Sequence, residues 1–221
     1  YLDSNINGFN SVLKFCVLKN IKNVIYASSS SVYGSNKDLP FSEENVLESP
    51  NSIYAATKIN NEQVANIYSK KFNLNCIGLR FFTVYGPFGR PDMAYFKFAS
   101  KLNAGKKIPI FNKGLNSRDM TYIDDAVDGI ILAIKNIKTS KTQHEIFNIG
   151  NNFPIKTIDL LNLIEKRYGI KGKISHEEYP ETVTTVADLR KSKNILGFNP
   201  KINLENGLEN FLRWFDSYYN S

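Results

Sequence analysis

An alternation of helical and extended patterns over the first 82 residues constrains the fold of this chain most strongly. Apolar residues recur at helical spacing over 4–19, and a short apolar strand pattern follows over 23–28. A second helical stretch, 52–72, contains no Gly or Pro and precedes another apolar strand pattern over 75–82. Strands separated by helices pair in parallel through crossover connections. The sequence therefore predicts an α/β fold with a Rossmann-like parallel sheet.

The chain changes character at a loop rich in glycine and proline, residues 86–91, which predicts a domain junction. We expect residues 1–85 to belong to the sheet domain and 86–221 to form a smaller mixed α/β domain, with segments around 119–150 returning to the sheet. Residues 35–49 are expected to form a loop. The further predicted helices are 93–103, 124–135 with Asp124 as cap, 157–168 with Thr157 as cap, 192–196 and 204–219, and the further strands are 108–111, 119–123 and 144–149.

Composition narrows the class of protein. The 221 residues are 42% hydrophobic and 22% charged, which is typical of a globular protein. The net charge of +7 comes from scattered Lys and Arg without a basic arm or a nucleic-acid motif, so we expect no nucleic-acid partner. No apolar run approaches the roughly 18 residues of a membrane span, and no signal peptide is visible. These features predict a cytoplasmic protein without a membrane partner.

The cysteines and histidines do not suggest a metal site. Cys16 and Cys76 stand among apolar neighbours, which predicts buried thiols in a reducing compartment. His144 and His176 lack the spacing of metal ligands, and no Cys-x-x-Cys pair is present. We therefore expect no metal.

Tyr54 and Lys58 carry the clearest chemical signal. Residues four apart on a helix face the same side, so the phenol and the ammonium are neighbours. A neighbouring positive charge favours the phenolate form of a tyrosine, which can then act as a general base on a hydroxyl group. A serine run, residues 28–31, ends the preceding strand and could share the hydrogen bonds of that hydroxyl. The same spacing also occurs in ordinary surface pairs, so the pair alone does not define a site.

A second Tyr-Lys pair at the same spacing is predicted to be unrelated. Tyr33 and Lys37 are separated by Gly34, Ser35 and Asn36, which together indicate a turn. The two side chains therefore need not lie on one helical face.

One expected motif of a dinucleotide-binding fold is absent from the sequence. Such folds open with a strand, a Gly-x-Gly-x-x-Gly turn and a helix that holds the pyrophosphate. Gly86 and Gly89 do not fit this pattern because Pro87 and Pro91 interrupt it. The chain begins at Tyr1 with a pattern typical of a helix inside a fold. We expect that an N-terminal portion with the glycine-rich half of the sheet precedes these residues.

Several motifs in order resemble the extended short-chain dehydrogenase/reductase family, whose members include NAD-dependent epimerases and dehydratases. The matching segments are 5–8 (Asn-Ile-Asn-Gly), 26–34 (Tyr-Ala-Ser-Ser-Ser-Ser-Val-Tyr-Gly), 54–58 (Tyr-Ala-Ala-Thr-Lys), 79–87 (Leu-Arg-Phe-Phe-Thr-Val-Tyr-Gly-Pro) and 118–125 (Arg-Asp-Met-Thr-Tyr-Ile-Asp-Asp). The resemblance runs the whole length of the chain. It implies an NAD cofactor, a sugar-nucleotide substrate and a homodimer.

The resemblance also implies a role for each matched residue. Tyr54 would be the base, Lys58 would hold the cofactor ribose and support Tyr54, and Ser29 would hydrogen-bond the reacting hydroxyl. The substrate-binding residues would be Ser30, Ser31, Thr83, Arg90, Phe111 and Arg118, and Ser28 and Phe81 would join Tyr54 and Lys58 at the cofactor. Asn5 would support the site from the first helix. For Phe111 the alternative is core packing, and for Arg118 it is an ion pair with Asp119 or Asp124.

Within the family, residues 80–94 are most similar to UDP-glucuronate 4-epimerases. Dehydratases of the family carry Asp-Glu where Ser30 and Ser31 stand, so the acid/base pair for eliminating water is not present here. The 4-keto intermediate of a uronic acid is a β-keto acid that loses CO₂ easily. Arg90, in the loop after Thr83, is expected to hold the substrate carboxylate through two parallel hydrogen bonds, unless it is only an exposed loop arginine.

One segment departs from the family. A second phosphate-binding Arg is expected within 175–181, but Glu178 stands near its place, and Lys173 or Arg190 could compensate. The expected function is inversion of C4 of UDP-glucuronate and UDP-galacturonate. The alternatives are another NAD-dependent sugar-nucleotide epimerase or a reductase, and a non-catalytic NAD-fold binding protein.

Overall fold

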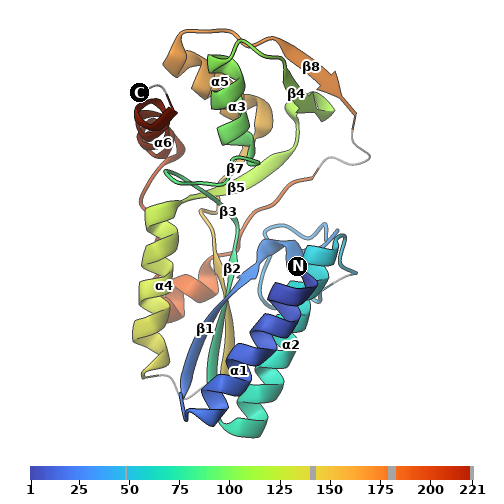
Figure 1. Cartoon of the computed structure of the whole chain (residues 1–221), viewed down its shortest axis with the longest axis vertical. Coiled ribbons are helices and arrows are strands. Elements are labelled where there is room, and N and C mark those ends of the chain that lie inside the picture. The colour runs from blue at the N-terminus through green and yellow to red at the C-terminus, as the bar shows by residue number, and fades with distance from the viewer. Residues whose placement is uncertain (48, 140–142, 179–182, 220–221) are drawn as a thin grey trace. The chain divides into compact units, whose positions relative to one another are not determined.

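The computed structural model describes residues 1–47, 49–139, 143–178 and 183–219. The chain folds into two compact units (Figure 1). Unit 1 consists of Tyr1–Phe82, Ala126–Gly150 and Ala187–Asn199, and unit 2 of Thr83–Asp125, Asn151–Val186 and Pro200–Ser221. The chain therefore leaves unit 1 and returns to it twice.

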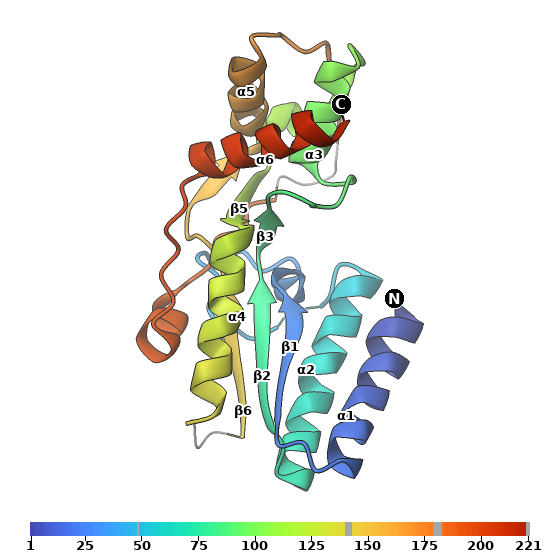
Figure 2. The same cartoon turned by 60° about the vertical axis from the view of Figure 1, so that its left-hand side comes forward.

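Unit 1 contains a three-stranded sheet in the order β1-β2-β6. The strands are β1 (Asn23–Ser29), β2 (Asn75–Phe81) and β6 (His144–Ile149), and both pairs are parallel. Figure 2 shows them side by side with their arrowheads pointing the same way. Ser29 pairs with Phe81, so the carboxyl ends of β1 and β2 meet at one edge of the sheet. The predicted α/β fold with a parallel sheet is confirmed.

Helices cover both faces of this sheet. A π-helical segment, Leu2–Gly8, continues into α1 (Phe9–Leu18), which lies beside α2 (Ile53–Phe72), whereas α4 (Ile123–Ile137) lies on the other side (Figures 1 and 2). Helix α2 starts where the sequence predicts because Ser52 Oγ accepts the backbone N–H of Ala55 at 3.1 Å. It extends for 20 residues, as expected for a segment without Gly or Pro.

The interior of unit 1 is apolar. One cluster joins Leu13 and Cys16 of α1 to Tyr26 of β1 and Cys76 of β2. A second cluster contains Tyr33, from the turn that follows β1, together with Phe41 and Phe82. Both cysteines are buried free thiols, as predicted.

Unit 2 is a mixed α/β structure. Strand β5 (Ser117–Tyr122) pairs in parallel with β3 (Thr83–Tyr85) and antiparallel with β7 (Pro154–Lys156). Strands β4 (Ile108–Phe111) and β8 (Ile174–Glu177) form a separate parallel pair. An aromatic core in which Tyr85, Tyr95, Phe96, Phe211 and Phe215 are buried joins the sheet to α3 (Ala94–Asn103), α5 (Thr157–Tyr168) and α6 (Leu204–Tyr219).

Two predicted helix caps are wrong. Helix α4 starts at Ile123, so Asp124 lies inside its first turn. A carboxylate there interacts favourably with the positive end of the helix dipole. Helix α5 has Lys156 at the cap position and Thr157 as its first residue. The Thr157 hydroxyl instead donates to the carbonyl of Asn116 at 3.0 Å. At α5 the predicted cap residue is therefore bonded to a neighbouring segment and not to the start of its own helix.

Candidate active site

Helix α2 places Tyr54 and Lys58 one turn apart on the same side. The Lys58 ammonium lies 5.7 Å from the centre of the Tyr54 ring, and both side chains are half-buried. At this separation a cation is attracted to an aromatic ring. Burial lowers the pKa of the Lys58 ammonium from its ordinary value. The two side chains predicted to interact are therefore neighbours in the folded unit.

Lys58 also links the helix to strand β1. Its Nζ donates to the carbonyl oxygen of Ala27 at 2.9 Å. Ala27 lies two residues before Ser29, where the strand ends. The ammonium is thus held at the carboxyl end of a parallel strand, which is where open α/β sheets bind their ligands.

Ser29 ends β1 and begins the next turn. Its Oγ accepts the backbone N–H of Ser31 at 3.2 Å and contacts Ser31 Oγ at 3.0 Å. It is the cap of a 3₁₀ turn, Ser30–Tyr33. The backbone contact fixes the orientation of the Ser29 side chain. Because that contact uses a lone pair of Oγ, the Ser29 hydroxyl hydrogen can serve another acceptor.

The first helix supports α2 through a polar chain. Asn5 Nδ2 donates to Thr57 Oγ1 at 2.9 Å, and Thr57 Oγ1 donates to the carbonyl of Tyr54 at 2.8 Å. The ring of Tyr1 lies 5.2 Å from that of Tyr54. Asn5, predicted to support the site, therefore contacts the helix turn that carries Tyr54.

The two further residues predicted at the cofactor differ in their surroundings. Ser28 is buried, and its Oγ donates to Glu62 Oε1 at 2.5 Å. The predicted cofactor contact of Ser28 therefore requires its backbone rather than its hydroxyl. Phe81 ends β2 beside Ser29 and is half-buried.

The unrelated Tyr-Lys pair behaves as predicted. The 3₁₀ turn ends at Tyr33, and Gly34 follows with φ of 59°, so Lys37 is not on a helix with Tyr33. Tyr33 is buried, and its hydroxyl donates to Asn148 Oδ1 at 2.6 Å.

Unit 2 carries the predicted substrate-binding residues Thr83 and Arg118. Thr83 begins β3 and is half-buried. Arg118, in β5, donates from Nη1 to the carbonyls of Ser117 at 3.1 Å and Val183 at 2.9 Å, and burial lowers its pKa. The Asp119 carboxylate, a partner in the alternative interpretation of Arg118, accepts the backbone N–H groups of residues 151 and 152 at 2.7 and 2.9 Å.

Arg90 and Phe111, also in unit 2, are exposed. The Arg90 side chain is 70% exposed and lies 3.3 Å from Asp92, which is itself exposed. Such a pair is weak because water screens it. Phe111 ends β4 and is 39% exposed, so simple core packing does not describe it.

Sequence reasoning missed a buried ion pair in unit 1. Glu62 on α2 and Arg80 on β2 form two hydrogen bonds of 2.9 and 2.8 Å, with side chains only 7% and 4% exposed. The available signal was Arg80 in an otherwise apolar strand, because a buried arginine requires a partner.

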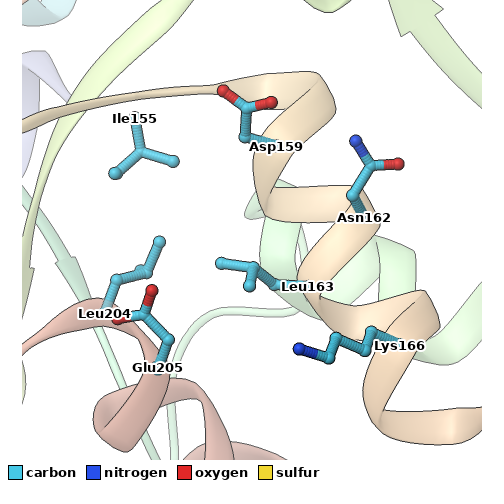
Figure 3. Close-up of a pocket in the computed structure, with 7 residues that line it drawn as sticks. All are labelled: Ile155, Asp159, Asn162, Leu163, Lys166, Leu204 and Glu205. Atoms are coloured by element: carbon cyan, nitrogen blue, oxygen red, sulfur yellow. The ribbon is translucent and has the colours of Figure 1, made fainter.

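A cavity of about 350 Å³ is present in unit 2 (Figure 3). Lys166 of α5 and Glu205 of α6 direct charged groups toward it. The lining residues are Ile155, Asp159, Asn162, Leu163, Lys166, Leu204 and Glu205. The residues predicted from the sequence to bind substrate or cofactor do not belong to this lining.

The described residues lack both a cluster of metal ligands and a membrane-crossing helix. Within them, no three His, Cys, Asp or Glu side chains gather as metal ligands would. Among the helices of the described ranges, none combines the length and the apolar character needed to cross a membrane.

Parallel strands covered by helices, with a Tyr-Lys pair at the carboxyl end of a strand, define a Rossmann-like nucleotide-cofactor fold. A family model described as the NAD dependent epimerase/dehydratase family matches residues 1–150. The chain belongs to this family.

Relatives and solved structures agree with this assignment. The uncharacterized protein MJ1055 of Methanocaldococcus jannaschii is 46% identical over 217 residues, which cover 97% of this chain and 65% of that protein. UDP-glucuronate 4-epimerase 4 of Arabidopsis thaliana is 41% identical over 235 residues, covering 99% of this chain and 54% of the relative. The UDP-glucuronic acid 4-epimerase of Bacillus cereus, in complex with UDP-glucuronic acid and NAD, superposes with a TM-score of 0.89 at 32% identity, covering 99% and 69% of the two chains. The chain thus spans between half and two thirds of the length of these curated relatives.

Proposed function

We propose that the protein containing this chain is an NAD-dependent UDP-sugar 4-epimerase, an isomerase. The observation that carries the proposal is the position of Lys58, which contacts both the Tyr54 ring and the carbonyl of Ala27 at the end of β1. A non-catalytic relative, the alternative from another class, has no need of a phenol and an ammonium held together beside a serine hydroxyl. Relatives bearing 4-epimerase names support the same activity.

The residues present fit one end of an NAD molecule. An ammonium and a phenol at the carboxyl end of a parallel strand suit the hydroxyl groups of the nicotinamide ribose. When bound, NAD would accept a hydride from C4 of the sugar and return it, so that no net oxidation occurs. Lys58 would hold the ribose, and Ser28 and Phe81 would contact the same region through the strand ends.

Proton transfer is assigned to this chain's own side chains. Tyr54 takes the proton of the sugar 4-hydroxyl as that carbon is oxidised and returns it when the hydroxyl is re-formed. The Lys58 ammonium stabilises the phenolate form of Tyr54, which is present before Tyr54 takes the proton and again after Tyr54 has returned it. The Ser29 hydroxyl, oriented by Ser31, donates to the oxygen at C4 in the keto state. Reduction of the rotated keto sugar from its other face inverts C4.

The substrate is proposed to be UDP-glucuronate or UDP-galacturonate. Support comes from the similarity of residues 80–94 to UDP-glucuronate 4-epimerases and from relatives with that name at 39 to 41% identity. Thr83 and Arg118 would contact the diphosphate, and Phe111 the uracil. Ser30 and Ser31 would approach the sugar, and Arg90 its carboxylate. The alternative is another UDP-sugar epimerase or a reductase.

The assembled protein is proposed to be a cytoplasmic homodimer. Val12, Phe15 and Leu18 of α1 are 52%, 52% and 81% exposed, an apolar surface that a second copy could cover. The buried free thiols Cys16 and Cys76 agree with a reducing compartment.

The test is product analysis with the full-length protein that contains this chain. It is incubated with NAD and UDP-glucuronate without added reductant, and the nucleotide sugars are separated by chromatography. UDP-galacturonate should accumulate until the two sugars reach equilibrium. Parallel reactions with UDP-glucose and UDP-N-acetylglucosamine distinguish the substrate alternatives. Unchanged sugars in all three reactions would contradict the proposal.

A further inference from the structure

The buried pair of Glu62 and Arg80 lies next to the proposed catalytic residues without belonging to them. The Glu62 carboxylate receives three hydrogen bonds. Arg80 Nε donates to Oε1 at 2.9 Å, Arg80 Nη2 donates to Oε2 at 2.8 Å, and Ser28 Oγ donates to Oε1 at 2.5 Å. Glu62 lies on α2, Ser28 on β1 and Arg80 on β2, so one carboxylate connects a helix to two strands.

A buried ion pair of this kind contributes little net stability to a fold. Removing two charges from water costs about as much as their attraction returns, and apolar residues of similar size often stabilise as well. Its geometric effect is different, because bidentate hydrogen bonds between a guanidinium and a carboxylate fix the relative orientation of both groups. This contrast suggests a role in placement.

The spacing of residues along α2 shows which side chains the ion pair could position. Tyr54, Lys58 and Glu62 follow one another at intervals of four residues. Lys58 is bonded to the carbonyl of Ala27, and Glu62 to the hydroxyl of Ser28. Two successive residues of β1 are therefore tied to two successive turns of α2, and the next residue of the strand is Ser29.

The other side of Ser29 is tied to Arg80 as well. The Arg80 guanidinium lies 4.8 Å from the centre of the Tyr33 ring, at the end of the turn that Ser29 caps. Tyr33 is also bonded to the buried Asn148 of β6. Ser29 thus stands between a residue held by Glu62 and a turn held by Arg80.

We infer that Glu62 and Arg80 are positioning residues that set the placement of Tyr54 and Lys58 relative to Ser29. In this role they act through Tyr54, Lys58 and Ser29 and not on substrate or cofactor directly. The inference rests on the proposed function in that the placement matters for proton transfer at Tyr54. Loosening the link shifts the helix against the strand end, and a misplacement of about 1 Å costs roughly 10²-fold in rate.

The decisive variants are Ser28→Ala, which removes one donor and leaves the ion pair, and Glu62→Gln, which removes the charge at constant shape. In the full-length protein, each is expected to lower kcat by about 10- to 100-fold with KM for the UDP-sugar changed by less than about threefold. Ser28→Thr, which restores the hydroxyl, should recover most of kcat. The double variant Ser28→Ala/Glu62→Gln should be no slower than Glu62→Gln alone, because Ser28 acts through Glu62.

Glu209→Gln provides the matched control. Glu209 pairs with Arg167 at 2.6 Å in unit 2, and both side chains are partly exposed. This variant loses a charged pair of similar length and should keep wild-type kcat. Thermal unfolding of every variant separates a smaller folded fraction from slower turnover. Ser28→Ala and Glu62→Gln proteins that are folded and turn over within about twofold of wild type would overturn the inference.

Crystal structures of wild type, Ser28→Ala and Glu62→Gln separate this inference from the proposed function. A displacement of about 1 Å between Tyr54 and Ser29 in the variants is expected even if the wild-type protein epimerises none of the tested sugars. In that case the function fails and the positioning role stands. Tyr54 and Ser29 left in their wild-type places by both variants would overturn the positioning role, whatever the activity.

Discussion

Lys58 Nζ is bonded to the carbonyl oxygen of Ala27 at 2.9 Å, and this bond ties the middle of the predicted catalytic helix to the end of a parallel strand. The same ammonium lies 5.7 Å from the centre of the Tyr54 ring. The Lys58 ammonium therefore binds the sheet through a backbone carbonyl and also lies near the phenol ring of Tyr54. The proposed proton transfer depends on this arrangement.

Replacement of Lys58 by Met should remove activity without unfolding the protein. The methionine retains most of the apolar volume but neither the bond to Ala27 nor the charge near Tyr54. Turnover of UDP-glucuronate is expected to fall by about 10²- to 10⁴-fold, with weaker NAD binding. Lys70→Met, an exposed change on the same helix, is the control and should behave as wild type. Near-normal turnover in Lys58→Met would exclude the proposed role of this residue.

Arg90→His should change the products of the reaction. If Arg90 holds the uronate carboxylate away from alignment with the 4-ketone, the variant should release CO₂ from the β-keto acid and form UDP-pentose products. Chromatography of reactions with UDP-glucuronate detects them. Arg213→His is the control, since Arg213 is also 70% exposed and also pairs with a carboxylate. An unchanged rate and an unchanged product set in Arg90→His would show that Arg90 is only an exposed loop residue.

His144 should make stability depend on pH. Tyr26 Oη lies 2.8 Å from His144 Nε2, and burial, the largest influence, lowers the pKa of the imidazole in the fold despite the nearby Glu62 and Glu145. The unfolded chain therefore takes up the proton first as the pH falls. Stability from the neutral imidazole is complete above about pH 6.5 and is lost as the pH falls through the folded-state pKa.

The measurement for His144 is the free energy of unfolding between about pH 5 and pH 8. His144→Gln keeps an acceptor for Tyr26 but cannot titrate, so its stability should vary less over this range than that of wild type. Glu43, whose pKa is raised by burial, contributes the opposite slope in both proteins, so the difference between the two proteins reports on His144. Identical pH dependence in the two proteins would contradict the prediction.

Gly78→Ala should destabilise unit 1. A Cβ at Gly78 in β2 would lie 2.6 Å from both Tyr26 Oη and Ile146 Cδ1, closer than such atoms can approach. The Tyr26 and Ile146 side chains must shift within a packed interior, at a cost of about 1–3 kcal/mol. Gly8→Ala is the contrasting variant, because its Cβ would meet only a backbone oxygen at 3.6 Å in a helical conformation. Chemical denaturation should separate the two, and equal stabilities would contradict the packing argument.

Local patterns explain why much of the fold was predictable. The strand His144–Ile149 and the helix Leu204–Tyr219 have the bounds that the sequence predicts. The strand is a short, largely apolar run, and the helix shows a strong amphipathic period. The strands Thr83–Tyr85, Pro154–Lys156 and Ile174–Glu177 were not predicted. They are three or four residues long and are defined by partners distant in sequence, which local patterns do not encode.

The candidate site was predictable only in part, for a similar reason. The spacing of Tyr54 and Lys58 follows from helix geometry and can be read from the sequence. The contact of Ser28 with Glu62 requires α2 to pack against β1. The contact of Glu62 with Arg80 requires the chain after α2 to return as β2 beside β1. The second phosphate-binding Arg was expected within residues 175–181, of which 179–181 lie outside the described residues.

The central claim is that Tyr54 transfers the proton in a C4 epimerisation, and turnover by Tyr54→Phe tests it most directly. The full-length variant is compared with wild type and with Tyr68→Phe, which makes the same chemical change at another half-buried position of α2. Interconversion of UDP-glucuronate and UDP-galacturonate is followed by chromatography under identical conditions. The account predicts a loss of at least about 10²-fold in Tyr54→Phe and wild-type turnover in Tyr68→Phe. Equal turnover in all three proteins would contradict it.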